Sequence, residues 1–146
     1  YIMSLPGFLV FCKNPQLTTG TTTEIIYGGV PLNGGYNDNN FFDFTTNSAI
    51  VPTNGKYSLV LKCTYEWNYF SHDEYASYIY ISINNKIHPY RCYDYIYGND
   101  QNTKTLTVTL QLNQGDIIKT FLGLSSYEYG TQLIHGDTYF NMQQIN

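Results

Sequence analysis

The sequence predicts an all-β protein built as a β-sandwich or barrel. Turn signals rich in Gly, Asn, Asp and Pro recur about every 8–12 residues, which is the spacing of short antiparallel strands. No amphipathic helix of ten or more residues is present, and the 16 tyrosines favour strands because aromatic rings fit the pleated surface. A length of 146 residues predicts one domain with a sizeable core.

The elements are expected in order from the alternation of apolar and polar residues. Residues 1–23 are expected to form an N-terminal lead-in segment or a stalk junction, either as a strand plus a loop or as a connector. Because the chain does not begin with Met, we expect a processed piece whose upstream part holds an anchor or stalk. Strands are predicted at 24–27, 41–46, 49–51, 57–67, 77–84, 90–97, 105–112, 117–122 and 138–145.

The turn before the longest predicted strand carries a strong local signal. Pro52 cannot donate to a strand ladder, and the pair Asn54-Gly55 favours positive φ. We therefore expect a tight turn at Asn54-Gly55, where Gly55→Val would cost about 1–3 kcal/mol of stability. Further turns are predicted at 84–86 and 113–116.

The predicted strand 77–84 separates two kinds of side chain. Ile79, Ile81 and Ile83 are expected to face the core, which places Tyr78 and Tyr80 on the opposite face. We predict that Tyr78 and Tyr80 lie at a subunit interface.

The predicted strand 90–97 carries Tyr93, Tyr95 and Tyr97 on one face. Alternate residues of a strand lie ~6.6 Å apart, so these rings form a strip. Such a strip serves either as buried contact area or as a platform for a sugar or a partner protein. We predict a ligand-binding platform for Tyr93, Tyr95 and Tyr97, because this run lies beside a loop at one end of the domain.

Five features occur in one order along the chain: Gly35-Tyr36-Asn37, a Pro-x-x-Gly-x-Tyr turn at 52–57, an Asn-rich turn at 84–86, an x-x-Gly-Asp turn at 113–116 and the closing strand 138–145. This order, over Glu24 to Ile145, resembles the globular heads of complement C1q and their tumour necrosis factor relatives. The resemblance implies that residues 24–146 form a two-sheet antiparallel β-sandwich with jelly-roll topology. It also implies a homotrimer that is used for binding and is not an enzyme.

Charge and hydropathy exclude two classes of partner. The net charge is −4 and no Lys/Arg cluster exists, so we expect no nucleic acid. The longest apolar run, near 8–12, is too short to span a bilayer, so we expect no membrane insertion.

The motifs of catalysis and metal binding are missing from the sequence. His72, His88 and His135 belong to no Gly-x-Ser-x-Gly or His-x-His pattern, and most acids fall in turns, where Asp is expected for backbone reasons. We expect no catalytic residue, no metal ligand and no cofactor. Calcium is the alternative left open, because related heads can bind it through loop aspartates. In this chain Asp94 and Asp100 flank one loop, although EF-hand spacing is lacking.

The cysteines and glycosylation motifs bear on the compartment. Cys12, Cys63 and Cys92 form an odd count, which fits either three buried thiols or one disulfide plus one free thiol. No Asn-x-Ser/Thr motif occurs, which argues against a eukaryotic secretory pathway.

These observations favour a non-enzymatic trimeric head of a surface appendage, such as a viral fibre or spike, or a phage or bacterial surface protein. It would lie on the exterior of a virion or cell and bind a host receptor or a surface glycan. Two alternatives stay open. One is a carbohydrate-binding β-sandwich module of a larger enzyme, and the other is a purely structural capsid or spike protein.

Overall fold

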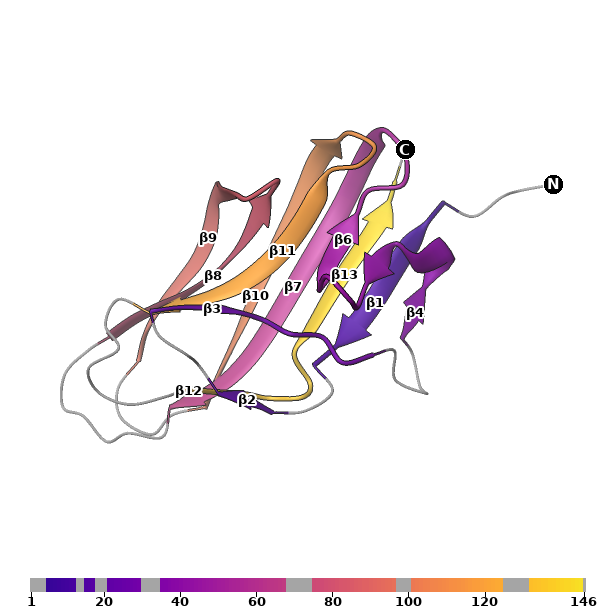
Figure 1. The fold of residues 1–146 in the computed structure, drawn as a ribbon. Helices are drawn as coiled ribbons and strands as arrows, with labels where there is room; N and C mark the ends of the chain where they lie inside the picture. The colour runs from indigo at the N-terminus through magenta and orange to yellow at the C-terminus, as the bar shows by residue number, and fades with distance from the viewer. Residues whose placement is uncertain are drawn as a thin grey trace.

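The computed structural model describes residues 5–12, 15–17, 21–29, 35–67, 75–96, 101–124 and 132–145. These residues form thirteen strands and one short 3-10 turn, η1 (Asp38–Asn40). The strands, drawn in Figure 1, are β1 (Gly7–Phe11), β2 (Gln16–Leu17), β3 (Thr22–Glu24), β4 (Tyr36–Asn37), β5 (Phe42–Asp43), β6 (Ser48–Ile50), β7 (Gly55–Trp67), β8 (Tyr75–Ile83), β9 (Lys86–Ile96), β10 (Gln101–Leu112), β11 (Ile117–Leu124), β12 (Gln132–Ile134) and β13 (Tyr139–Gln144). No helix of the described residues has the length and hydropathy of a membrane span.

The strands form two antiparallel sheets that pack face to face. Sheet A has seven strands in the order β2-β12-β7-β13-β1-β4, with β10 also paired to β7. Sheet B has six strands in the order β5-β6-β11-β8-β9, with β3 also paired to β11. Sheet B faces the viewer in Figure 1, where β3, β6 and β11 lie in front of sheet A. The predicted two-sheet antiparallel sandwich with jelly-roll topology is confirmed.

Strand β1 lies inside sheet A, between β13 and β4. Its residues Phe8 and Val10 have no exposed surface and belong to the core. The segment predicted as 1–23 therefore contributes β1, β2, most of β3 and core side chains to the sandwich. The domain boundary at residue 24 stays a prediction.

Alternation along the long strands builds the core between the sheets. In β7, Tyr57, Leu59 and Leu61 point inward and are at most 1% exposed, whereas Ser58 and Val60 on the other face are half-buried. Aromatic rings fill one end of the core. Phe8 lies at the centre of this group, with ring centroids 4.9 Å from Phe41, 5.4 Å from Phe42 and 5.1 Å from Phe140.

The tight turns with positive φ lie at other residues than Asn54-Gly55, which the sequence favoured most strongly. Asn54 and Gly55 are absent from the described positions with positive φ, so the prediction of a positive-φ turn at Asn54-Gly55 was wrong. Gly55 instead begins β7. The β8–β9 hairpin turns at Asn84 (φ 52°) and Asn85 (φ 65°), and the β10–β11 connection turns at Gly115 (φ 89°).

Two of the short predicted strands were also placed wrongly. The strand expected at 41–46 is reduced to β5, because 44–47 is a turn whose side chains find partners nearby. The Asp43 side chain accepts a hydrogen bond from Thr45 N–H at 2.8 Å. The Asn47 amide bridges to the next segment, since its Oδ1 accepts from Tyr27 N–H and its Nδ2 donates to Ile25 O. Of the strand expected at 24–27, only Glu24 lies in β3, and residues 25–27 follow it outside any strand.

Candidate functional site

Strands β11, β8 and β9 lie side by side in sheet B and present their second face to solvent. Ile79 and Ile81 of β8 lie in the core, and Ile83 packs against it, as the alternation predicted. Tyr78 and Tyr80 therefore belong to the outer face. The name aromatic face is used below for Tyr78, Tyr80, Arg91, Phe121 and Gly123.

Cross-strand register aligns the rings of this face in two rows. Tyr80 pairs directly with Phe121, and their rings stack at 5.1 Å between centroids with an interplanar angle of 13°. Tyr78 pairs with Gly123, where a Cβ atom would come within 2.4 Å of the tyrosine ring, so the ring lies flat on the glycine. The two tyrosine rings are 5.5 Å apart. Each ring is thereby held by its cross-strand partner, which fixes the surface before any ligand arrives.

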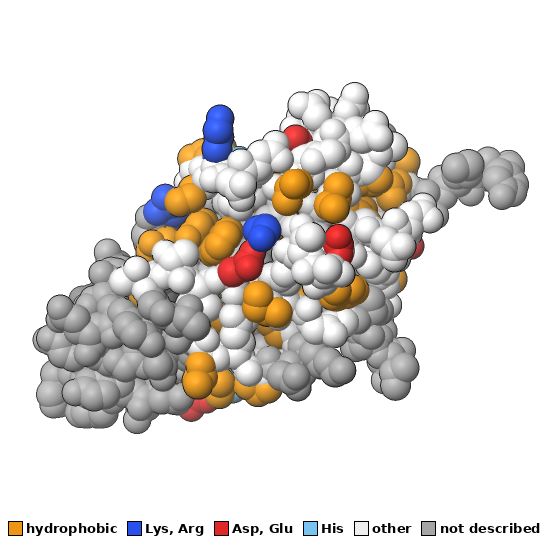
Figure 2. Space-filling model, viewed as in Figure 1, with side chains coloured by type: hydrophobic (Ala, Val, Ile, Leu, Met, Phe, Trp, Pro, Cys, Tyr) orange, Lys and Arg blue, Asp and Glu red, His pale blue; other side chains and the backbone are white. Residues whose placement is uncertain are grey.

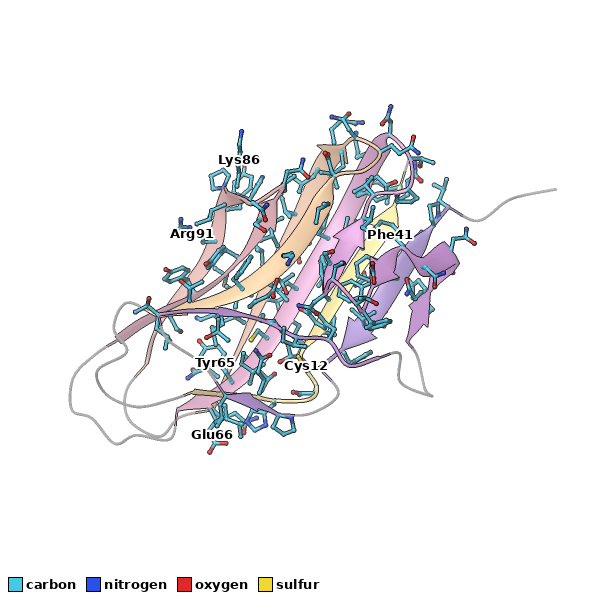
Figure 3. All side chains as sticks on the ribbon, viewed as in Figure 1. Cys12, Phe41, Tyr65, Glu66, Lys86 and Arg91 are labelled. Atoms are coloured by element: carbon cyan, nitrogen blue, oxygen red, sulfur yellow. The ribbon has the colours of Figure 1, made fainter. Side chains whose placement is uncertain are left out.

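Arg91 completes the aromatic face from the neighbouring strand β9. It is exposed, it pairs with Tyr80 in register, and it is the sole arginine of the chain. Its Cζ atom lies 5.3 Å from the ring centroid of Tyr78 and 5.6 Å from that of Tyr80, which is cation–π geometry. Arg91 and Lys86 both project from β9 in Figure 3.

The environment of Tyr80 favours its neutral phenol. Burial raises the pKa of Tyr80 above its ordinary value, because the buried site disfavours the phenolate. A hydrogen bond with the side chain of Thr22 lowers this pKa again, and so does the charge of Arg91. With 4% of its surface exposed, Tyr80 acts as the floor of the aromatic face, whereas Tyr78 and Phe121 are half-buried and reach solvent.

A bulge in β9 extends this surface toward the edge of sheet B. The register of β8 and β9 shifts between Tyr80 and Ser82, opposite a segment that contains Pro89, which has no N–H to donate. Tyr90 is 62% exposed beside it, and its ring lies 5.1 Å from that of His88. Burial lowers the pKa of His88, so its imidazole is neutral at pH 7.

Charged groups are few on the rest of this face. Figure 2 shows hydrophobic side chains spread over it and only isolated blue and red atoms among the described residues. Lys119 forms an ion pair with Glu24 at 3.0 Å. The exposed Ile50 and Ile117 form a cross-strand pair on β6 and β11.

Of the predicted tyrosine platform, the structure describes the backbone of Tyr93 and Tyr95. The backbone of Tyr93 pairs with Tyr78, and that of Tyr95 pairs with Ala76. Directly opposite positions of an antiparallel pair share a face of the sheet, so both predicted tyrosine runs hold positions on the outer face of sheet B. The side chains of Tyr93 and Tyr95, and all of Tyr97, lie outside the described residues.

The other predicted chemical groups do not converge. His72 and Asp100 lie outside the described residues, as does the side chain of Asp94. His135 Nε2 lies 3.3 Å from Glu66 Oε2 on sheet A, whereas His88 belongs to β9 of sheet B. No cluster of three or more His, Cys, Asp or Glu side chains suited to a metal ion occurs among the described residues.

The three cysteines are free thiols. Cys12 follows β1 and Cys63 lies in β7, with β13 between these two strands. Two strand spacings separate their Cα atoms by ~10 Å, whereas a disulfide needs about 7 Å or less. Burial raises the pKa of the Cys12 thiol to about 12 and also raises that of Cys63. Lys104, paired with Cys63, is 4% exposed, and burial lowers its pKa.

The outer face of sheet A has a different character. Strand β10 exposes a column of four threonines, and the neighbouring strands add half-buried apolar groups. The name threonine face is used below for Thr103, Thr105, Thr107, Thr109, Val60 and Tyr139. Val60 lies in the middle of it, paired with Thr107 on one side and with Asn141 on the other.

Sequence reasoning missed Arg91 and Phe121 as members of the site. The sequence could have pointed to Arg91, because the single arginine of the chain occurs within a run of tyrosines. Phe121 gave none, because its stacking partner is 41 positions away in the chain and is set by register alone.

Comparison with known proteins supports the fold and nothing finer. No protein-family model matches the chain, and no curated protein matches its sequence. Among solved structures, the globular domain of the zebrafish complement 1qA protein is similar, with a TM-score of 0.66 at 13% sequence identity. The match covers 97% of this chain and 98% of that chain. The chain therefore has the C1q-like jelly-roll fold.

Proposed function

We propose that this protein is the non-enzymatic head domain of a surface appendage, a viral fibre or spike or a phage or bacterial surface protein. It assembles as a homotrimer on the exterior of the virion or cell and attaches to a host receptor or surface glycan. The C1q-like fold supports a head domain. Fold alone does not assign a function, so the proposal depends on the surface chemistry.

The aromatic face is the observation that carries the binding function. Rings fixed by cross-strand stacking offer a large contact area without the entropic cost of ordering them on binding. Arg91 adds one strong hydrogen-bonding group to a surface that is otherwise poor in charge. Tyr93 and Tyr95 are proposed to continue this platform along β9, as their register indicates, and Tyr97 is proposed to extend it on the sequence pattern alone.

The threonine face is the better-suited candidate for the trimer contact. Its exposed threonines and half-buried Val60 and Tyr139 carry no charge, and the cores of subunit interfaces are depleted of charged residues. One cation lies among them, because Lys62 pairs with Thr105 and Tyr139 and its Nζ is 5.6 Å from the ring centroid of Tyr139. Closed cyclic symmetry then buries the same patch in every copy. The predicted role of Tyr78 and Tyr80 at the interface is the alternative, and the two contacts lie on opposite sides of the sandwich.

Two measurements test the proposal. Light scattering at micromolar concentration should give three times the mass of one chain, and the purified trimer should bind host-cell surfaces or a glycan array. A monomer that binds nothing on cells or glycans would contradict both parts.

The aromatic face also favours a second candidate, a carbohydrate-binding module of a larger enzyme. That module would share the sandwich and the rings but would bind glycans as a monomer. A monomeric mass together with glycan binding would therefore select the module over the head. A trimer that binds no cell or glycan would select a purely structural capsid or spike protein.

A further inference from the structure

We propose that Arg91, held over the rings of Tyr78 and Tyr80, anchors the carboxylate of an acidic sugar. The sugar is a ring that carries a carboxyl group, as sialic acids and uronic acids do. This inference rests on the proposed attachment function and names the ligand class of its binding face.

The chemistry of arginine carries the first step. A planar guanidinium binds a carboxylate through two parallel N–H···O bonds, and it is weakly hydrated, so it loses little on contact. The chain has six lysines and one arginine, and that arginine stands on the aromatic face. Stacking on two rings limits the rotamers of Arg91, which reduces the entropy lost when a ligand binds.

The aromatic rings carry the second step. A pyranose ring has one face of C–H groups that packs on an aromatic ring, while its polar groups point outward. Tyr78 and Phe121 are half-buried, so part of their aromatic surface lies open on the face that carries the guanidinium. Among common surface ligands, an acidic sugar combines an apolar ring face with a carboxylate at its edge.

Long-range electrostatics oppose the ligand, which makes the prediction sharper. The chain carries a net charge of −4, so an anion gains little from the field of the whole molecule. Lys119 is paired with Glu24. Recognition therefore depends on short-range contact with Arg91, and each site is expected to be weak, with avidity supplied by the assembled head.

Lys86 provides a matched control. It is exposed on the same strand β9, at the hairpin turn, where its backbone pairs with Ile83, and Figure 3 labels both side chains. Lys86→Gln removes one positive charge from the same strand and leaves Arg91 and its rings in place. Arg91→Lys keeps the charge and removes the planar fork.

The test titrates the full chain with 3′-sialyllactose, trigalacturonic acid and neutral lactose, observed by saturation-transfer NMR and calorimetry. Both acidic sugars should bind the wild type more tightly than lactose does. Arg91→Lys should weaken that binding by about tenfold or more, and Lys86→Gln should change it by less than about twofold. Reduction of the sugar carboxyl to an alcohol should abolish the preference.

Two results would overturn the inference. One is equal binding of acidic sugars by wild type and Arg91→Lys, and the other is binding of lactose as tight as that of the acidic sugars. Either result leaves the attachment function standing if the trimer still binds cells. Thermal unfolding checks that Arg91→Lys is folded, and if it is not, the carboxyl-reduced sugar decides the question with the wild type alone.

Discussion

At the residue scale, burial controls the chemistry of the thiols. Cys12 is 2% exposed and Cys63 fully buried, and burial raises the pKa of both because a thiolate is poorly solvated inside the sandwich. The folded protein keeps the Cys12 thiol protonated up to a pKa of about 12, whereas the unfolded chain loses that proton near 9.0. Between these values the folded state binds more protons, so its stability falls as pH rises.

We therefore predict that Cys12→Ala loses less stability with rising pH than the wild type does. The free energies of unfolding of the two proteins should diverge above pH 9, by at most about 1.4 kcal/mol per pH unit. Urea unfolding at pH 7, 9 and 10.5 measures this, and slopes are compared because the substitution also leaves a small cavity. Parallel pH curves for the two proteins would show that Cys12 ionises normally in the folded state.

At the scale of elements, the β8–β9 hairpin depends on two asparagines with positive φ. Asn84 and Asn85 adopt the left-handed backbone that a two-residue hairpin turn requires. Asn84 also ties this hairpin to the next turn, because its Nδ2 donates to Asp116 Oδ1 at 2.9 Å and its Oδ1 accepts from Ile117 N–H at 2.8 Å. The edge of sheet B that carries Arg91 is held by this turn.

We predict that Asn85→Val destabilises the protein by about 1–2 kcal/mol, because a β-branched residue resists positive φ. Asn85→Gly should be neutral or stabilising. Gly55→Val serves as the comparison, since Gly55 begins β7 without positive φ and should tolerate the change better. Thermal unfolding of the three variants measures the order, and a larger loss in Gly55→Val than in Asn85→Val would contradict the assignment.

The elements that could be predicted from sequence are those whose burial repeats with a period of two. Strands β7 and β10 follow this rule over eight or more residues, and each was expected close to its observed position. In β8 the sequence alternates, although Tyr80 and Ser82 on its outer face are buried as well. The segment 41–46 was missed because Asn47 bonds to residues about twenty positions away, which no local pattern encodes. Arg91 was missed for a similar reason, since the tyrosine rings that it contacts lie on the neighbouring strand β8.

At the scale of the whole molecule, the two outer faces of the sandwich offer different surfaces. The aromatic face on sheet B holds stacked rings and Arg91, whereas the threonine face on sheet A is built of threonines, Val60 and Tyr139 with Lys62 over the Tyr139 ring. A trimer that buries one face leaves the other open to a ligand. Assignment of the trimer contact to one sheet therefore also decides which sheet can bind sugar.

We predict that a charge at the centre of the threonine face breaks the trimer and that the same charge on sheet B does not. Val60→Asp places a carboxylate between Thr107 and Asn141, where every copy would bury it against its neighbour. It should weaken association by about tenfold or more and shift the light-scattering mass toward one chain. Ile50→Asp is the matched control, because Ile50 is 39% exposed on sheet B and should leave the trimer intact. Thermal unfolding of both variants confirms that they fold.

The reverse result, with only Ile50→Asp dissociating, would put the interface on sheet B and support the interface role of Tyr78 and Tyr80. It would also remove the open surface that Arg91 needs to bind an acidic sugar.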